Sequence, residues 1–397
     1  MARCTLRVTS GHRSSVTGPC LVNILVAHNV PCRHRGGMAR IMDYLHAPLR
    51  DDGHRVDFLC AEDAPVVMRG RAGRLGFPLL VVARARAAAR RGEPYDVVNV
   101  HEPSAAAIAT LRRAAGSPQV VVTTHGVEQR AFELAREEAR LGRSRLPLRT
   151  RIGFPLTSLW QSRVGLTRAD HVFCLNTQDR DYLERRFGVR PEAITRIFPG
   201  ADAVYADVAG PRDYVRGDRL LFAGTWRANK GIGDLVPAFS ELAGRHPAVT
   251  LRVLGPGVAE DAVRAAFPAP VRPRIHVVRS DTEEESAAVF AGADVFVLPS
   301  LFEGTPLTLI EAMMSGLPIV TTDTCGMRDV IAHERTGLLV APRSPGALRD
   351  ALERLLGDRT LRARLGQAAR EEARARYTWP AAAQVVRHAY ETLVGPA

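Results

Sequence analysis

Lysine is nearly absent from this sequence, because the chain has 54 Lys and Arg residues and Lys230 is its one lysine. Long apolar runs are absent too, since none reaches the roughly 18 residues that a membrane-spanning helix needs. The first 20 residues are polar and basic and lack the apolar core of a secretory signal. We therefore expect residues 1–20 to form a disordered tail and the protein to be cytoplasmic.

The sequence is also poor in the spacings that cysteine chemistry needs. Its six cysteines form no C-x-x-C pair, and several lie in apolar surroundings such as VFCLN (172–176) and DFLCAE (57–62). A disulfide framework is not expected at this chain length, so we predict buried, reduced thiols. The sequence shows no zinc spacing, and we predict neither a metal nor a bound cofactor.

The excess of arginine gives a formal net charge of +12. Such a charge permits attraction to nucleic acid or to an anionic membrane. The basic residues alternate with acidic ones, as in RDYLERRFGVRPE (180–192), which is typical of a solvated face. No specific nucleic-acid motif is present. A non-catalytic binder of nucleic acid or of an anionic surface stays open as one reading, supported by charge alone.

Apolar runs alternate with helical patterns along the chain, and two such series are separated by a Gly-, Pro- and Asp-rich break at 203–218. This alternation predicts an α/β fold with two tandem doubly wound, Rossmann-like halves. Ligands bind such sheets at the carboxyl ends of the strands, so the facing halves predict a cleft. The strands are expected at 21–30, 56–61, 96–102, 119–126, 171–176 and 193–202, and then at 219–224, 250–257, 275–280, 295–300, 318–323 and 336–342.

The break sets the expected domain boundaries. We expect a first domain at 21–205 and a second domain at 206–376. Residues 377–397 contain a helical pattern, and we expect this last helix, around Tyr390, to cross back to the first domain.

The segment SLFEGTPLTLIEAMMSGLPIV (300–320) carries two glutamates in an E-x7-E spacing, Glu303 and Glu311. Gly304 and Pro306 fit a turn and the first turn of a helix, and Thr305 can cap that helix. Free backbone N–H groups and a helix N-terminus there predict an anion site. A carboxylate one turn into the helix can accept from a ribose diol. The alternative is two solvated glutamates.

The segment LLFAGTWRANKGIGDLVPAF (220–239) contains the one lysine. Gly224 fits a sharp turn after the strand, and Arg227 and Lys230 fall in the loop or first turn before a helix. A helix N-terminus disfavours cations, so the pair suggests that an anion lies nearby. The alternative is two exposed cations.

Several stretches together resemble the family 4 retaining glycosyltransferases of the GT-B fold. The second half is similar in FAGTWRANKGIGDLVPAF, LGPGVAED, GADVFVLPSLFEGTPLTLIEAMMSGLPIVTTD and GLLVAP. The first half is similar in the Gly-Gly loop of ILVAHNVPCRHRGGMARIMDYLHAPLRDDGHRVDFLC, in YDVVNVHEPSAA and in TTHG. The similarity covers roughly residues 21–394.

The resemblance implies transfer of a sugar from a UDP- or GDP-linked donor to a hydroxyl acceptor without a metal. It also implies that the nucleobase meets backbone edges near 278–281. The resemblance implies that Lys230 and Arg227, in the loop after Gly224, bind the diphosphate, that Glu303 contacts the sugar and that Glu311 holds the ribose. Backbone amides of Gly304, Thr305, Pro306 and Leu307 would meet the sugar and the phosphate. From the first half, His125 would face the sugar and the Gly36–Gly37 loop would approach the donor.

Two departures from the family pattern concern the phosphate site. The family often has arginine directly after the strand-end glycine, where this chain has Thr225 with Arg227 two places on. Either Arg227 reaches the phosphates from its new position or Lys230 acts without it. Cys325–Gly326 stands where a second Gly-Gly pair is common.

The DRD at 179–181 lies in a helical pattern, so we interpret it as solvated surface rather than a metal motif.

Residues 127–168 are arginine-rich and helical in period. We hypothesise that they form an interfacial patch for a lipid-linked or anionic acceptor at the inner face of the membrane. The alternative, favoured by the pattern, is a helix that packs its apolar face on the domain. The patch would comprise Leu146, Leu148, Phe154, Leu159 and Trp160 with Arg143, Arg145, Arg149, Arg151 and Arg163.

The function expected from these residues is therefore hexosyl transfer in polysaccharide, glycolipid or glycosylated small-molecule synthesis. A GT-B-like enzyme that epimerises the nucleotide sugar itself is the alternative within the same fold. The E-x7-E spacing and the Lys-Gly pair favour the transferase.

Overall fold

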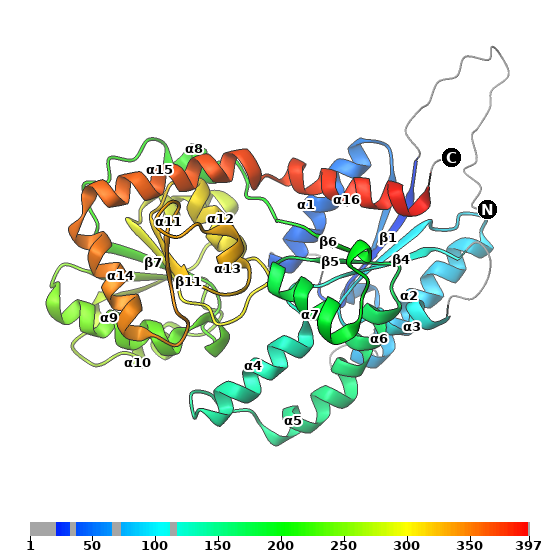
Figure 1. Ribbon diagram of the computed structural model, residues 1–397, viewed down its shortest axis with the longest axis horizontal. Coiled ribbons are helices and arrows are strands. Elements are labelled where there is room, and N and C mark those ends of the chain that lie inside the picture. Colours follow the sequence, from blue (N-terminus) through cyan, green and yellow to red (C-terminus); the bar gives the residue numbers. More distant parts are fainter. Residues whose placement is uncertain (1–20, 32–36, 66–72, 112–116, 396–397) are drawn as a thin grey trace, which may run out of the picture.

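The computed structural model describes residues 21–31, 37–65, 73–111 and 117–395. Two halves lie side by side, each built around a twisted sheet with helices on its faces (Figure 1). Each sheet has six strands, all of them parallel. The doubly wound α/β prediction is confirmed.

The sheet of the first half has the strand order β2-β1-β3-β4-β5-β6. Every strand lies within the range that the sequence assigns to a strand, except that β2 begins one residue earlier, at Arg55. The elements are β1 (Asn23–Ala27), α1 (Gly37–Asp51), β2 (Arg55–Leu59), α2 (Gly73–Arg90), β3 (Val97–His101), α3 (Ala106–Leu111), β4 (Gln119–Thr123), α4 (Glu128–Arg140), α5 (Leu148–Phe154), a π-helical segment (Pro155–Leu159), α6 (Trp160–Arg168), β5 (His171–Cys174), α7 (Thr177–Phe187) and β6 (Ile194–Arg196).

The sheet of the second half has the order β12-β11-β10-β7-β8-β9. The chain thus adds β8 and β9 on one side of β7 and then β10, β11 and β12 on the other side. The strand order therefore reverses between the neighbouring strands β7 and β10. The elements are α8 (Val204–Ala209), β7 (Arg219–Ala223), a 3-10 turn (Ala228–Lys230), α9 (Ile232–Arg245), β8 (Thr250–Leu254), α10 (Glu260–Ala265), β9 (Ile275–Val278), α11 (Glu283–Ala291), β10 (Val295–Leu298), α12 (Leu307–Met314), β11 (Ile319–Thr322), α13 (Cys325–Val330), β12 (Leu338–Val340), α14 (Pro345–Gly357) and α15 (Arg359–Arg376).

The strands are continuous apolar runs because both faces of each sheet are covered. In β1, Leu25 and Ala27 pack into the core on one face, while Ile24 and Val26 pack into the core on the other. All four side chains are fully buried. A strand buried on both sides shows no alternation of polar and apolar residues, which is the pattern that the sequence has.

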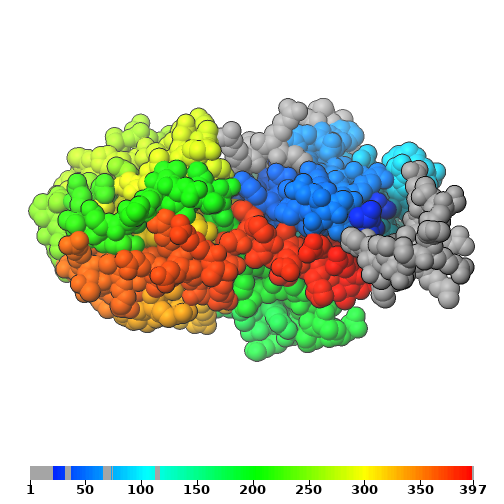
Figure 2. Space-filling model, turned by 90° about the horizontal axis from the view of Figure 1, so that it is seen from above, coloured from blue at the N-terminus to red at the C-terminus, as the bar shows by residue number. Residues whose placement is uncertain are grey.

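The last helix, α16 (Trp379–Val394), leaves the second half and packs on α1 of the first. Figure 2 shows its red surface beside the blue surface of α1. The ring of Tyr390 is buried, and its hydroxyl accepts a hydrogen bond of 2.7 Å from Nδ2 of Asn99. Nδ1 of His46 lies 2.7 Å from the carbonyl of Met42 and must donate to it. Nε2 of the neutral His46 therefore accepts from the Tyr390 hydroxyl at 3.0 Å.

Of the three cysteines among the described residues, two follow the expectation. Cys174 and Cys325 are buried free thiols, and burial raises the pKa of Cys174 to about 12. Cys60 instead takes part in a disulfide, so the prediction of reduced thiols is wrong at this residue. Spacing in the sequence does not reveal which cysteines meet in space.

Candidate functional site

The site lies where the winding of the second sheet reverses. β7 and β10 are hydrogen-bonded neighbours, with Leu220 opposite Val295. The loops that follow them, 224–231 and 299–306, therefore leave the sheet side by side at its carboxyl edge. This juxtaposition brings the lysine segment and the E-x7-E segment together, although neither sequence pattern states it.

A cavity of about 380 Å³ opens between these loops and the first half. Both halves contribute to its wall, which confirms the predicted interdomain cleft. Its lining residues are Gly37, Met38, Arg40, Ile41, His125, Leu175, Tyr205, Ala223, Gly224, Thr225, Lys230, Leu254, Gly255, Ser280, Ser286, Glu303, Gly304, Thr305, Pro306, Leu307, Thr308 and Glu311.

Lys230 is the cation at the centre of this arrangement. It ends the 3-10 turn after β7, and its stem lies beside Gly224. Its Nζ makes a short contact with Oε1 of Glu303, which also accepts a 3.0 Å hydrogen bond from Oγ of Ser300. The side chains of Lys230 and Glu303 are 18% and 12% exposed, so both are held in place rather than solvated. The alternative of exposed cations is therefore wrong for Lys230, although Arg227 is exposed, and the alternative of solvated glutamates is wrong for Glu303.

The stretch after Glu303 is clamped against the first half. Nδ2 of Asn176 donates to the carbonyl oxygens of Glu303 at 3.3 Å and Gly304 at 3.1 Å. A Cβ on Gly304 would lie 2.6 Å from the carbonyl oxygen of His125, so only glycine allows this approach. The hydroxyl of Thr305 donates to the carbonyl of Leu175.

Thr305 is thereby unavailable as a helix cap. α12 has Pro306 at its N-cap and no side-chain cap hydrogen bond, so the predicted capping role of Thr305 is wrong. The pattern suggested a cap because threonine before a helix usually makes one. Here the hydroxyl ties the two halves together instead, and Leu307 and Thr308 in the first turn of α12 line the cavity.

Glu311 lies one turn into α12, as predicted, but it is 2% exposed and has a protein partner. Nη2 of Arg40, in the first turn of α1, lies 2.9 Å from its Oε1. Nε of Arg40 lies 2.8 Å from Oε1 of Glu283, whose Oε2 accepts a 2.8 Å hydrogen bond from the hydroxyl of Tyr205. Burial raises the pKa of Glu311, and the Arg40 guanidinium opposes that shift.

His125 lines the cavity from the first half, just beyond β4. Its Nε2 lies 2.6 Å from Nδ1 of His101, and the two rings stack 4.7 Å apart. Burial, and then the nearby His28, lower the pKa of His125 to about 4. The imidazole is therefore neutral at neutral pH and offers hydrogen bonding rather than charge. Sequence analysis missed His101, whose signal is its place at the end of β3.

Two predicted donor residues stand apart from this cavity. Arg227 is exposed and is not among the residues that line it. The contact of Arg227 with the donor phosphates stays a prediction. Gly36 lies outside the described residues, whereas Gly37 begins α1 and lines the cavity.

Two family models match the two halves of the chain. The model of glycosyltransferase family 4 matches residues 35–204, and that of glycosyl transferases group 1 matches residues 217–358. The chain belongs to this family of glycosyltransferases. The resemblance drawn from the sequence is thus confirmed.

Relatives and solved structures agree with this family. The D-inositol 3-phosphate glycosyltransferase of Corynebacterium glutamicum (strain R) is 32% identical over 56% of this chain and 57% of that protein. The phosphatidyl-myo-inositol mannosyltransferase of Mycolicibacterium smegmatis is 26% identical over 91% of each chain. The chain thus spans little more than half the length of the first relative. A sucrose-phosphate synthase structure from Thermosynechococcus elongatus superposes with a TM-score of 0.72 and 22% identity, covering 94% of this chain and 99% of that one. This confirms the GT-B fold.

The DRD at 179–181 lies in α7, as the helical pattern indicates. Asp179, however, is fully buried, and Arg130 and Asn176 contact its carboxylate. The interpretation as solvated surface is therefore wrong for Asp179. Its position three residues after the helix-capping Asn176 explains its burial, because the cap turns it inward. Among the described residues, no group of three or more His, Cys, Asp or Glu side chains could hold a metal ion.

A buried carboxyl group of the first half was missed by sequence analysis. Glu102 follows β3 directly, and its Oε1 accepts hydrogen bonds from the Ser162 hydroxyl and, at 3.1 Å, from the backbone N–H of Glu128. Burial, and then the charge of Glu128, raise its pKa to about 8. Glu102 therefore ties α4 and α6 to the end of β3.

The arginine-rich segment folds as helices that project from the first half (Figure 1). Its expected apolar patch splits into two sets. Phe154 is half-buried and stacks on Phe132 at 5.7 Å, while Leu146 and Leu159 are half-buried too. Arg143 is not a patch residue, because it pairs with Glu138 and reaches across to Asp234 of the second half.

The other set is an exposed stripe at a four-residue spacing along α5, the π-helical segment and the start of α6. Leu148, Ile152, Leu156 and Trp160 are 69%, 56%, 68% and 49% exposed. A helical segment that packed its apolar face on the domain would bury these side chains. The alternative of simple packing is therefore wrong for this stripe. Ile152 and Leu156 were not among the expected patch residues, although their spacing was legible in the sequence.

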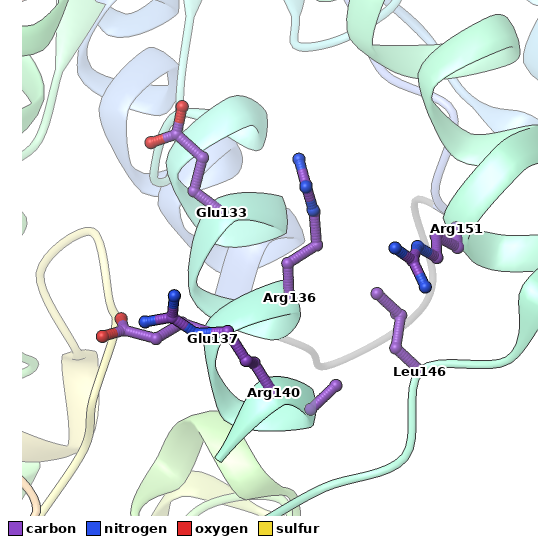
Figure 3. Close-up of a pocket in the computed structure, with 7 residues that line it drawn as sticks. Glu133, Arg136, Glu137, Arg140, Leu146 and Arg151 are labelled. Atoms are coloured by element: carbon purple, nitrogen blue, oxygen red, sulfur yellow. The ribbon is translucent and has the colours of Figure 1, made fainter. Parts of the chain in front are cut away.

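Beside the stripe, α4 and α5 enclose a cavity of about 540 Å³. Figure 3 shows the side chains of Arg136 and Arg151 extending from facing helices into the space between them. Neither arginine forms an ion pair within the described part of the chain. No helix among the described residues is long and apolar enough to cross a membrane.

Proposed function

We propose that this chain is a metal-independent, retaining hexosyltransferase that uses a UDP- or GDP-linked sugar and a hydroxyl acceptor. The observation that carries the proposal is the pairing of Lys230 with Glu303 at the strand reversal, inside a cavity shared by both halves. Residues 206–376 would bind the donor and residues 21–205 the acceptor. The donor is a co-substrate, and no further cofactor is proposed.

Each side chain of the cavity has a role in this proposal. Lys230 and the N-terminus of α12 stabilise the charge that builds on the β-phosphate as the diphosphate leaves. Glu303 contacts the sugar, Glu311 accepts from the ribose diol, and the neutral His125 hydrogen-bonds the sugar. The acceptor oxygen bonds to the anomeric carbon on the face from which the diphosphate departs. Its proton passes to the departing phosphate oxygen, so retention needs no carboxylate nucleophile.

Donor turnover in the absence of acceptor tests this function. The protein is incubated with UDP- and GDP-hexoses, and the products are separated by anion-exchange chromatography and examined by NMR. Slow release of free nucleoside diphosphate is the expected result, because water can replace the acceptor. An altered but intact nucleotide sugar would show epimerisation instead. If neither product forms and the protein binds nucleic acid or vesicles, it is a non-catalytic binder.

We also propose that the exposed stripe docks this enzyme on an anionic membrane at its cytoplasmic face, where the acceptor lies. Apolar side chains beside unpaired arginines are the composition of an interfacial helix. Arg145, Arg149 and Arg151 are exposed next to the stripe. The relative from Mycolicibacterium smegmatis, named for a lipid, spans nearly the whole chain and supports a lipid-linked acceptor.

Replacing Leu148, Ile152 and Leu156 together with serine is expected to weaken binding to phosphatidylglycerol vesicles by at least about 10-fold. Each buried aliphatic side chain contributes about 1.5–3 kcal/mol when fully buried, and partial insertion recovers only part of that. Cosedimentation with vesicles containing phosphatidylglycerol measures the change.

The matched control is the double change of Leu75 and Leu79 to serine on α2. These leucines are 52% and 57% exposed, also four residues apart, but lie on another helix. Vesicle binding should be unchanged in this variant. Equal losses in both variants, or wild-type binding to pure phosphatidylcholine as strong as to the anionic vesicles, would contradict docking by this stripe.

A further inference from the structure

Both glutamates of the E-x7-E spacing are paired with cations in the cavity. Lys230 contacts Glu303, and Arg40 lies 2.9 Å from Glu311. These two are the cations among the described residues that line the cavity. His125 is neutral there, and Arg227 is exposed outside it. A donor diphosphate entering this cavity would thus meet one cation from each half of the molecule.

A ribose that binds Glu311 competes with the Arg40–Glu311 pair. A diol that donates one hydrogen bond to each oxygen of the carboxylate shares Oε1 with Arg40 and thereby weakens that pair. Both ion pairs of Arg40 are close but poorly aligned, because its Nε and Nη2 and Oε1 of Glu311 are buried and make no hydrogen bond within the described part of the chain. Buried polar atoms in that state favour exchange for better partners.

Arg40 has an anchor that would remain. Its Nε lies 2.8 Å from Glu283, which Tyr205 holds through a 2.8 Å hydrogen bond. The Nη end of the guanidinium can therefore leave Glu311 while the Nε end stays on Glu283. A planar guanidinium with several donors suits this division between two anions.

The diphosphate position lies within reach of that free end. Glu311 is four residues beyond Leu307, which corresponds to about 6 Å along the helix axis. The N-terminus of α1 also touches α12, because a Cβ on Gly37 would lie 3.6 Å from Cδ1 of Leu307. Arg40 contacts Glu311, so its guanidinium lies about one helical turn along α12 from Leu307, where the proposed diphosphate would meet the start of that helix.

We infer that Arg40 serves as the second diphosphate-binding cation, which contacts Glu311 before the donor binds and moves to the diphosphate when the ribose binds Glu311. Arg40 thereby fills the role of the arginine that this chain lacks at Thr225, and it does so from the opposite half. This inference rests on the proposed function, in which Glu311 binds the ribose. Arg40 would thus exchange a contact between the two halves, the one with Glu311, for a contact with the donor.

Calorimetric titration with a nucleotide and its nucleoside tests the inference, because only the nucleotide carries the diphosphate. UDP with uridine and GDP with guanosine are titrated into the wild-type chain and into the R40A, R40K and R50A variants. In R40A we expect the affinity for UDP or GDP, whichever the wild-type chain binds, to fall about 10-fold or more. Loss of a charge-assisted contact implies a fall of this size. Affinity for the nucleoside should be unchanged or higher, since Glu311 is released.

R40K should retain part of the nucleotide affinity, and it keeps the test usable if R40A does not fold. R50A removes an exposed arginine from the far end of the same helix and should leave both affinities unchanged. Tighter binding of nucleotide and nucleoside alike in R40A would show a simple competitor and overturn the inference. Equal weakening of both would show a structural role and overturn it too. If the wild-type chain binds neither UDP nor GDP, the proposed function itself fails.

Discussion

Replacing Lys230 with alanine is expected to lower kcat by about 10²–10³-fold, the loss that follows removal of one donor aimed at developing charge. Nζ of Lys230 is fixed against Glu303 in a cavity shared by both halves, so no reorganisation is needed when the diphosphate leaves. The affinity for UDP or GDP should fall as well, by about 1.5–3 kcal/mol. Steady-state kinetics and calorimetry measure the two effects separately.

Lys230→Arg keeps the charge, but we expect it to be a poor substitute. The stem of Lys230 lies beside Gly224, and its ammonium meets a single carboxylate oxygen of Glu303. A compact ammonium approaches phosphate as a point charge, whereas a guanidinium requires a forked geometry and more room. A fully active arginine variant would show that charge alone suffices.

Arg227→Ala separates the two candidate cations of this segment. Arg227 is exposed and outside the cavity, so its loss should cost no more than about 0.5 kcal/mol, as for ordinary surface positions. An Arg227→Ala variant as damaged as Lys230→Ala would show instead that Arg227 contributes to the phosphate site.

The fold could be predicted from the sequence because its signals are local. A strand that is buried on both faces has a continuous apolar sequence, as at 295–300, and a helical pattern separates it from the next strand. The break at 203–218 then divides the runs into the two sheets that the structure has. Positions such as Glu303 and Glu311 follow from the same local logic, because strand ends and first helical turns are set by nearby residues.

The partners of those residues could not be predicted in the same way. Glu303 meets Lys230 because β7 and β10 are neighbours, and strand order is not written in any one segment. Glu311 meets Arg40 across the two halves, which depends on how the halves pack. The hydroxyl of Thr305 was assigned to its own helix and is used instead between the halves. Local patterns therefore located the site, while long-range packing decided how its charges are satisfied.

Gly231→Ala is expected to be the most damaging single methyl group near the site. A Cβ on Gly231 would lie 1.7 Å from the carbonyl oxygen of Pro299, the residue that follows β10 by one position. The backbone φ of Gly231 is also +73°, a conformation that alanine adopts only with strain. The clash is with backbone, so the loop carrying Lys230 must move away from the loop carrying Glu303. We expect a loss of at least about 3 kcal/mol in the free energy of unfolding.

Gly244→Ala in the same stretch of chain is the matched control. Gly244 lies near the end of α9, which begins directly after Gly231, and a Cβ there would meet nothing within 4 Å. Alanine should stabilise that helix by roughly 0.5–1 kcal/mol and leave kcat unchanged. Denaturant unfolding and donor turnover of the two variants separate a general effect of a methyl group from a specific one. If the two variants have the same free energy of unfolding and the same rate of donor turnover, the close approach of the two loops does not hold the site together.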